Sequence, residues 1–338
     1  MTIEHRTTLP QRIAFFIIYD IVATAAILIL LELGIRLLSP DIRPEATSYS
    51  LVTDSLYGSS AGLRPGASGY SGGARVAVDA LGFWKYSAQT DSLQDGWLLL
   101  GDSVTLGIGI EPDSTFAGRM AGHIRTYSVH NPSWIGYSSA DYLNITRAFL
   151  HDHIPSALQR HPIRRVTVFW TLNDVYSNCD IGLPPGQSIR NRGSLILGWL
   201  RRNYHTYSWL KAMLLDRAKD YYEFDRQFYQ WTDARYLSAL ADLDSLQGLC
   251  LQNNVRLDVV LLPYEYQLRT HDSTVFAPQH MLAHDLNRRG IEYHDASAAS
   301  ELQSTDSKSL YLFGDGIHFS SKGHRSVFQF LARVDQTQ

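Results

Sequence analysis

The chain has 338 residues, of which 45% are hydrophobic and 19% charged, so it can bury a sizeable core and is not globally disordered. Its 30 Lys and Arg residues against 33 Asp and Glu residues give a formal net charge of −3, which argues against a general nucleic-acid binder. With only two cysteines, Cys179 and Cys250, the chain contains neither a cysteine-rich zinc module nor a disulfide-stapled small fold. The count leaves open whether these two cysteines are bridged.

Residues 13–38, IAFFIIYDIVATAAILILLELGIRLL, are strongly apolar and carry only three charges. As a helix, the part at residues 13–31 spans roughly 28 Å, about the thickness of the hydrocarbon core of a bilayer. A cleaved signal peptide would have a shorter apolar stretch and a small-x-small cleavage site, whereas this segment continues with LGIR. It is also apolar nearly all round, unlike an amphipathic helix. We therefore predict a single uncleaved transmembrane anchor at residues 13–38, after an N-terminal tail of residues 1–12.

The basic residues around this anchor do not set its orientation, because two precede it and two follow it. Since the N-terminal tail is short and the C-terminal part is large, we expect the C-terminal domain to lie outside the cytoplasm, in the periplasm or at the cell surface. Asp20, inside the span, either borders the membrane interface or faces a membrane-embedded partner protein, as acids within membranes usually do.

Residues 39–95 are rich in glycine, with six glycines between residues 62 and 82. Residues 74–80, ARVAVDA, alternate apolar and polar side chains as a half-buried strand does. We predict a tether followed by a small β-rich preface to the main domain. The GSSAG sequence at residues 58–62 formally matches the nucleophile elbow of another hydrolase fold, but no helical pattern follows it and we attribute it to chance.

Residues 96–338 alternate between strand-like and helix-like segments. Apolar and β-branched runs predict strands at residues 97–100, 128–131, 165–170, 257–262 and 291–294. Longer patterns predict helices at residues 112–125, 140–160 and 322–334. Near-continuous apolar strands separated by helices indicate an α/β fold of three layers, in which helices cover both faces of a parallel sheet.

Residues 181–245 interrupt this alternation and predict a helical insertion rich in aromatic residues. Aromatic side chains at this density either pack a helical core or form a lid or groove for a sugar or acyl group over the site. The sequence leaves both interpretations open.

Polar motifs follow the predicted strands, where ligands bind in parallel sheets. GDSVTLG begins at residue 101, TLND at residue 171 and DGIH at residue 315. A serine nucleophile needs a base to take its proton, and the base needs an acceptor that holds its tautomer, roles that Ser103, His318 and Asp315 can supply. An Asp and a His three residues apart can lie on one side of a helical turn. A serine at a strand-to-helix junction also lies near helix N-terminal amides, which favour negative charge.

In order, these motifs resemble the four blocks of the GDSL, or SGNH, hydrolase family. GDSVTLG resembles the first block, Gly136 in NPSWIGYSS stands where the second block has its glycine, and Asn173 in TLND matches the third. Asp315 and His318 match the last block, Asp-x-x-His. The resemblance implies a flavodoxin-like SGNH fold with Ser103 as nucleophile, His318 as base and Asp315 as its orienting acid. It also implies an oxyanion hole formed by the backbone N–H groups of Ser103 and Gly136 and the side chain of Asn173.

Residues 63–66 and 81–83 are similar to the preface found in bacterial membrane-anchored members of the family. The predicted function is a membrane-anchored serine esterase or deacetylase that acts on an ester, such as an acylated glycan or envelope component, outside the cytoplasm. An O-acyltransferase that moves the acyl group to a polysaccharide hydroxyl shares the same acyl-serine half-reaction and stays open. The third hypothesis is a non-catalytic accessory subunit of a membrane complex. The intact set of Ser103, Asp315 and His318 argues against it.

The sequence predicts no metal and no cofactor. The HDH sequence at residues 151–153 does not indicate a metal site, because residues two apart on a helix point in different directions. His324 is expected at the surface or behind the site. The expected partners are the ester or acylated carbohydrate substrate, the membrane around residues 13–38 and, beside Asp20, a membrane-embedded protein, with no nucleic acid.

Overall fold

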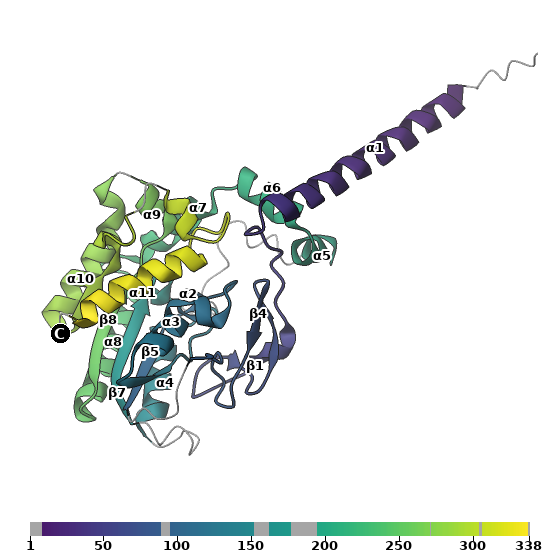
Figure 1. Cartoon of the computed structure of the whole chain (residues 1–338). Helices are drawn as coiled ribbons and strands as arrows, with labels where there is room; N and C mark the ends of the chain where they lie inside the picture. The colour runs from purple at the N-terminus through teal and green to yellow at the C-terminus, as the bar shows by residue number, and fades with distance from the viewer. Residues whose placement is uncertain are drawn as a thin grey trace, which may run out of the picture.

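The computed structural model describes residues 9–88, 95–151, 162–176, 195–270, 272–303 and 306–336. Its main sheet has five parallel strands in the order β6-β5-β7-β8-β9 (Figure 1). These strands are β5 (Asp95–Leu100), β6 (Tyr127–His130), β7 (Ile163–Trp170), β8 (Arg256–Leu261) and β9 (Glu292–Asp295). The order is the flavodoxin-like 2-1-3-4-5, so the predicted flavodoxin-like α/β fold is confirmed.

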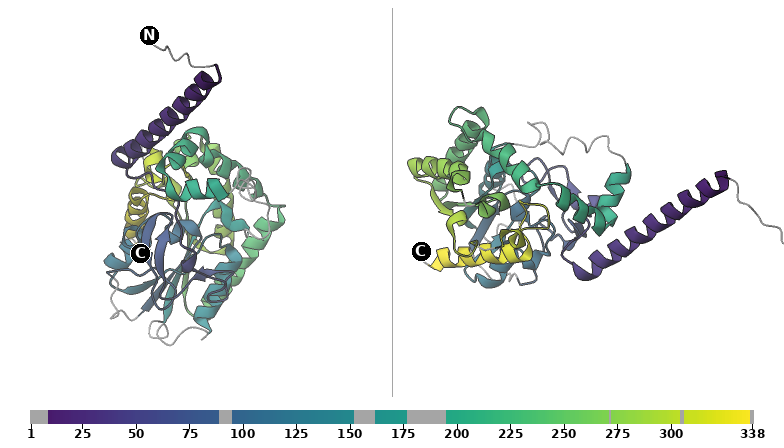
Figure 2. Two further views of the ribbon diagram at one scale, coloured as in Figure 1. Left: turned by 90° about the vertical axis from the view of Figure 1, so that its right-hand side faces the viewer. Right: turned by 90° about the horizontal axis from the view of Figure 1, so that it is seen from above.

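Helices cover both faces of this sheet and make three layers (Figures 1 and 2). They are α3 (Phe116–His123), α4 (Ser139–Leu150), α8 (Ala234–Gln252), α10 (Ala277–Arg289) and α11 (Ser321–Gln336). α3 packs against α11, and α4 packs against α8. Right-handed crossovers place α4, α8 and α10 on one face and α3 and α11 on the other. Of the predicted helix at residues 140–160, the structure shows the part up to Leu150, and residues 152–161 lie outside the described residues.

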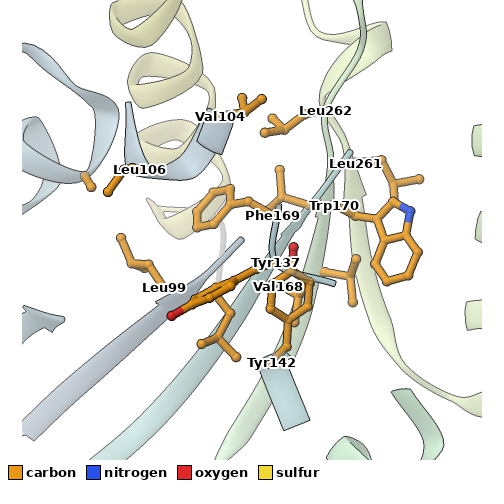
Figure 3. Close-up of a cluster of buried hydrophobic side chains, with 14 of the residues drawn as sticks. Leu99, Val104, Leu106, Tyr137, Tyr142, Val168, Phe169, Trp170, Leu261 and Leu262 are labelled. Carbon is orange, nitrogen blue, oxygen red and sulfur yellow. The ribbon is translucent and has the colours of Figure 1, made fainter. Parts of the chain in front are cut away.

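The central strands are almost wholly buried, as expected for parallel strands covered on both faces. In β7 only Arg164 is exposed, and in β5 only Asp95 is not buried. Leu99 of β5, Val168 of β7 and Leu261 of β8 belong to one apolar cluster (Figure 3). This packing fixes the carboxyl ends of three neighbouring strands side by side at one edge of the sheet.

The predicted β-rich preface consists of two short antiparallel pairs. They are β1 (Val52–Thr53) with β2 (Gly62–Leu63), and β3 (Ser68–Ser71) with β4 (Ala74–Ala77). The indole of Trp84 donates a hydrogen bond to the carbonyl oxygen of Leu106 at 2.8 Å. The backbone N–H of Gly109 donates to the carbonyl oxygen of Ser71 at 3.1 Å. These bonds attach the preface to the segment that follows β5.

The helix α1 (Leu9–Leu38) projects away from the rest of the chain (Figures 1 and 2). It is long and apolar enough to cross a membrane, and its most apolar stretch is not buried against the protein. The end of α1 nearest the domain contacts α6 (His205–Leu214).

Between β7 and α8 the structure describes three helices that cover the carboxyl edge of the sheet. They are α5 (Leu195–Asn203), α6 and α7 (Arg217–Asp225). Within the range 181–245 predicted as an insertion, α8 already begins at Ala234 and packs in the helical layer against α4. Residues 181–194 of that range lie outside the described residues.

Candidate active site

Ser103 is the first residue of α2 (Ser103–Leu106), directly beyond the end of β5. Asp102 caps this short helix, because its Oδ1 accepts a hydrogen bond from the backbone N–H of Val104 at 2.8 Å. Gly101 makes the tight turn possible, since a Cβ there would lie 2.0 Å from a side-chain oxygen of α2. The turn holds Ser103 at the carboxyl edge of the sheet with 6% of its surface exposed.

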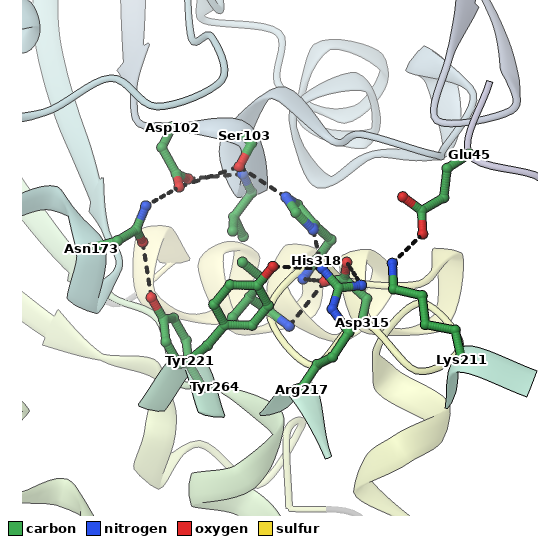
Figure 4. A network of polar contacts seen from close by, with 12 residues as sticks. Glu45, Asp102, Ser103, Asn173, Lys211, Arg217, Tyr221, Tyr264, Asp315 and His318 are labelled. Atoms are coloured by element: carbon green, nitrogen blue, oxygen red, sulfur yellow. Dashed lines mark hydrogen bonds and ion pairs between the residues drawn. The ribbon is translucent and has the colours of Figure 1, made fainter. Parts of the chain in front are cut away.

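His318 and Asp315 complete a catalytic arrangement with Ser103 (Figure 4). Nε2 of His318 lies 2.9 Å from Oγ of Ser103, and Nδ1 of His318 lies 2.7 Å from Oδ1 of Asp315. The two residues do not share a helical turn as predicted. They occupy a loop ahead of α11, in which Asp315 Oδ1 also accepts the backbone N–H of His318 at 2.9 Å. Gly316 has a φ of 89° in this loop, and a Cβ there would lie 2.4 Å from Cβ of Ala218 in α7.

The two charged partners shift each other's protonation. Burial alone would raise the pKa of Asp315, but the charge and hydrogen bond of His318 lower that pKa well below its usual range. Burial alone would lower the pKa of His318, but the charge and hydrogen bond of Asp315 raise it above its ordinary value. An ionised Asp315 therefore holds the proton on Nδ1 of His318, which leaves Nε2 as the acceptor that faces Ser103.

Arg217 stands behind Asp315, and sequence reasoning did not identify it. Its Nη1 lies 3.5 Å from Oδ2 of Asp315, the carboxylate oxygen that His318 does not use. Its Nη2 donates to the hydroxyl of Tyr221, one turn further along α7, at 2.5 Å. Burial alone would lower the pKa of Arg217, but the charge of Asp315 raises it, so the guanidinium stays charged. No motif in the sequence links α7 to the last block, because the two meet only through the fold.

Asn173 lies beyond the end of β7, in the 3₁₀ turn Leu172–Val175. Its Nδ2 donates a hydrogen bond to Oδ2 of Asp102 at 2.9 Å, while its Oδ1 lies 2.8 Å from the Thr171 hydroxyl and 2.9 Å from the Tyr264 hydroxyl. The amide orientation is thus fixed on both sides, and an Asn side chain carries a second N–H that the Asp102 contact does not use.

Gly136, the least specific of the sequence matches, lines the same cavity as Ser103 and Asn173. Its φ of 76° lies in the left-handed region that glycine adopts without strain. The structure thus brings together all five predicted site residues, three as a hydrogen-bonded set and two as neighbours in one cavity wall.

A buried carboxyl group extends this network behind Asn173. The hydroxyl of Tyr264 lies 2.7 Å from Oδ2 of Asp225, and the hydroxyl of Tyr176 donates to Oδ1 of Asp225 at 2.5 Å. Burial raises the pKa of Asp225 to about 7, even though both tyrosine hydrogen bonds lower it. Tyr264 follows β8, where site residues are expected in a parallel sheet, so its position after a strand was a usable signal. Asp225 had no such signal.

The site opens into a cavity of about 1240 Å³. Its walls come from the tether at residues 41–52, from α5, α6 and α7, and from the loops at residues 308–322. The wall carries charges of both signs: the bases Arg43, Arg201, Arg202, Lys211, Arg217, Lys308 and Lys322, and the acids Asp41, Glu45, Glu111, Asp220, Asp225 and Asp315. The cavity combines these charged groups with apolar side chains such as Ile42, Trp134 and Leu312.

Several other predicted features lie outside the site. His324 is not at the surface: it is fully buried, its Nδ1 accepts the backbone N–H of Phe116 at 3.2 Å, and burial lowers its pKa to about 3.

Cys250 is a buried free thiol in α8, and Cys179 lies outside the described residues. Within the described parts of the chain, no group of three or more His, Cys, Asp or Glu side chains is arranged to hold a metal ion. His151 is exposed at the end of α4, and its two neighbours in the HDH sequence lie outside those parts.

No family model matches the chain, and no curated protein matches it. Solved structures similar to it include a member of the lipolytic protein G-D-S-L family from Veillonella parvula, with 11% identity, a TM-score of 0.41, and coverage of 71% of this chain and 97% of that one. A lipase/acylhydrolase from Enterococcus faecalis has 12% identity and a TM-score of 0.37, with 70% and 94% of the two chains covered. A GDSL-like lipase from Bacteroides thetaiotaomicron has 12% identity and a TM-score of 0.37, with 72% and 89% covered.

The neighbours of this chain include GDSL hydrolases. The ordered sequence blocks and the hydrogen-bonded set at Ser103, rather than these distant matches, carry the proposal that follows.

Proposed function

We propose that the protein is a membrane-anchored serine esterase that works through an acyl-serine intermediate. The observation that carries the proposal is the chain of contacts from Ser103 Oγ to His318 Nε2 at 2.9 Å and from His318 Nδ1 to Asp315 at 2.7 Å. The Ser103 hydroxyl lies farther, at 3.4 Å, from Oδ2 of Asp102. The imidazole is therefore the nearer acceptor for the serine proton.

The reaction follows from these positions. Oγ of Ser103 attacks the ester carbonyl carbon while Nε2 of His318 takes the hydroxyl proton, and the carbonyl oxygen becomes an oxyanion. The second N–H of Asn173 and the backbone N–H groups of Ser103 and Gly136 stabilise that oxyanion. The alcohol leaves with the proton from His318. A water molecule then gives a proton to His318 and attacks the acyl-serine, which releases the acid and restores the Ser103 hydroxyl.

The acceptor of the acyl group decides between an esterase and an O-acyltransferase. The cavity of about 1240 Å³ has room for a second polar ligand beside the acyl-serine, which keeps a carbohydrate hydroxyl as an alternative acceptor. A test uses the full-length protein in detergent with a chromogenic acetyl ester, with and without oligosaccharide. Release of acetate that oligosaccharide does not change supports the esterase, whereas transfer of acetate to sugar supports the acyltransferase. No turnover and no labelling of Ser103 by a fluorophosphonate would refute both and favour a non-catalytic accessory subunit.

We also propose that α1 anchors the catalytic domain outside the cytoplasm. The length and apolar surface of α1 support the anchor, and the large domain that follows α1 is the part that we place outside the cytoplasm. Reporters fused after Gln338 test it: alkaline phosphatase, which is active outside the cytoplasm, is expected to be active, and green fluorescent protein is expected to be dark when exported through the Sec pathway. The opposite pattern would reverse the orientation and remove the case for an envelope substrate.

A further inference from the structure

Large apolar side chains are exposed on α5 and α6 and at the turn after α6, beside the end of α1. They are Leu197, Trp199, Leu210, Met213, Leu214 and Leu215. Met213 is 66% exposed and Leu214 is 78% exposed. Single exposed leucines are ordinary on a protein surface, but a group of this size within 19 residues marks an interaction surface.

Hydrogen bonds fix the start of α6 to α1. Glu32 of α1 accepts the backbone N–H of His205 at 3.2 Å and both the backbone N–H and the hydroxyl of Thr206 at 2.8 Å. Arg36 binds Glu32 at 2.7 Å. Glu32 directly follows residues 13–31, the part of α1 that matches the hydrocarbon thickness. If α1 spans a membrane, α6 therefore begins at the depth of the membrane interface.

The exposed apolar face of α6 continues from its contact with α1. Thr206, Leu210 and Met213 follow the i, i+4, i+7 spacing of one helix face, and Thr206 is the residue bonded to Glu32. Another side of α6 lines the catalytic cavity through Tyr207 and Lys211. α6 thus separates the cavity from the surroundings of α1, and Figure 1 shows α5 and α6 beside the α1 end nearest the domain.

We propose that α5 and α6 dock on the bilayer surface, with Leu210 and Met213 in contact with lipid. The proposal rests on the insertion of α1 put forward above. Continuity with α1 selects the bilayer as occupant, because any membrane that α1 crosses adjoins this face. Trp199 of α5, which is 50% exposed, is a residue type that favours membrane interfaces.

The docked position has a consequence for substrate choice. With one side of α6 on lipid and another on the cavity, the cavity lies next to the bilayer surface. The substrate class is therefore an ester carried by a molecule held at that surface, such as a lipid-linked or membrane-bound glycan, rather than a freely diffusing ester.

Fluorescent labels on the full-length protein test the docking. Met213→Cys and Leu251→Cys are made in a Cys179→Ser, Cys250→Ala background, labelled with an environment-sensitive NBD dye, and reconstituted into vesicles of phosphatidylcholine and phosphatidylglycerol. Leu251 is the matched control, because it is 69% exposed and lies at the end of α8 near the opposite edge of the sheet. A third label at Val22→Cys, within α1, reports insertion itself.

Lipids with a nitroxide near the headgroup are expected to quench the dye at residue 213 by about twofold or more, since interfacial helices bury their apolar face about 5–10 Å into this region. The dye at residue 251 should change little. Quenching by deep nitroxides at residue 22 without headgroup quenching at residue 213 would overturn the docking while keeping the anchor. No quenching at residue 22 would overturn the anchor and the docking together. If the dye at residue 213 is shielded from quenching by iodide but is not quenched by the lipid nitroxides, protein covers this face. That outcome would also overturn the docking.

Discussion

The two sides of Ser103 are built in different ways. On one side, His318 and Asp315 lie three residues apart in one loop and contact each other at 2.7 Å. On the other side, Asn173 is held by side chains from separate segments, among them Tyr264, which follows β8 at 2.9 Å from the Asn173 amide oxygen. The first side is local in sequence and charged. The second depends on how distant segments of the fold meet.

This difference separates the transfer of a proton from the stabilisation of an anion. The loop side carries displaced pKa values, with that of His318 raised and that of Asp315 lowered, as a base and its orienting acid require. The amide side ends in a buried carboxyl group, Asp225, whose pKa lies at about 7. Substitutions on the two sides should therefore change activity by different amounts and with different pH profiles.

The largest effect is expected for Ser103→Ala, which removes the group that both sides serve. Turnover of a chromogenic ester should fall by about 10⁴-fold or more, because covalent catalysis is lost while binding remains. The melting temperature should stay close to that of the wild type, and labelling by a fluorophosphonate should disappear. A variant that keeps a near-wild-type rate would place the nucleophile elsewhere.

Asp315→Asn tests the loop side and should lower kcat by about 10³–10⁴-fold, since the imidazole loses the acceptor that holds its tautomer. His318 must be neutral to take the serine proton, so wild-type activity should rise as the pH passes the raised pKa of His318. Removing the negative charge lowers that pKa, and the acid limb of kcat/KM should move to lower pH. Asp220→Asn is the matched control, an exposed acid in the same cavity, and should leave the limb in place. If the acid limb of kcat/KM stays at the same pH in Asp315→Asn, Asp315 does not set the pKa of the group that titrates there.

The fold class and the loop side were predictable from sequence because both leave local patterns. Apolar runs of strand length gave the five strands, and Asp-x-x-His placed Asp315 beside His318. The form of that contact was not predictable, since the loop depends on Gly316 packing against α7. Arg217 and Asp225 were missed because α7 has no strand before it and no motif, and its place at the site follows only from tertiary packing.

Asn173→Ala tests the amide side. It should lower kcat by about 10²–10³-fold with little change in KM, because one oxyanion donor acts mainly in the transition state. Asn173→Asp should be at least as damaging, since a carboxylate repels the developing oxyanion. If Asn173 only shapes its turn, both variants would instead have lower melting temperatures and keep their rate per folded molecule. A rate within about threefold of the wild type would rule out the oxyanion role, because it falls far short of the usual effect of one donor.

The smallest effect is expected behind Asn173, where Tyr264 acts as a positioning residue. The Tyr264 hydroxyl has one proton and two acceptors, Oδ1 of Asn173 at 2.9 Å and Oδ2 of Asp225 at 2.7 Å. Tyr264→Phe should lower kcat about 10-fold below pH 7, the value of roughly one hydrogen bond. A fall in melting temperature with an unchanged kcat would show that Tyr264 serves the fold alone.

Asp225→Asn sharpens this last test through its pH dependence. Burial raises the pKa of Asp225, the hydrogen bonds of Tyr176 and Tyr264 lower it, and the charge of Asp102 raises it further. The resulting pKa of about 7 means that Asp225 holds a proton below pH 7. A protonated Asp225 can donate to the Tyr264 oxygen, which leaves the Tyr264 proton for Asn173. As the pH rises through about 7, the carboxylate draws that proton away, and wild-type kcat should fall by up to about 10-fold, the value of one hydrogen bond. In Asp225→Asn the amide N–H donates at every pH, so this alkaline decline should vanish while the acid limb set by His318 remains. A decline that persists in Asp225→Asn would assign it to another group and leave Tyr264 with a fixed role.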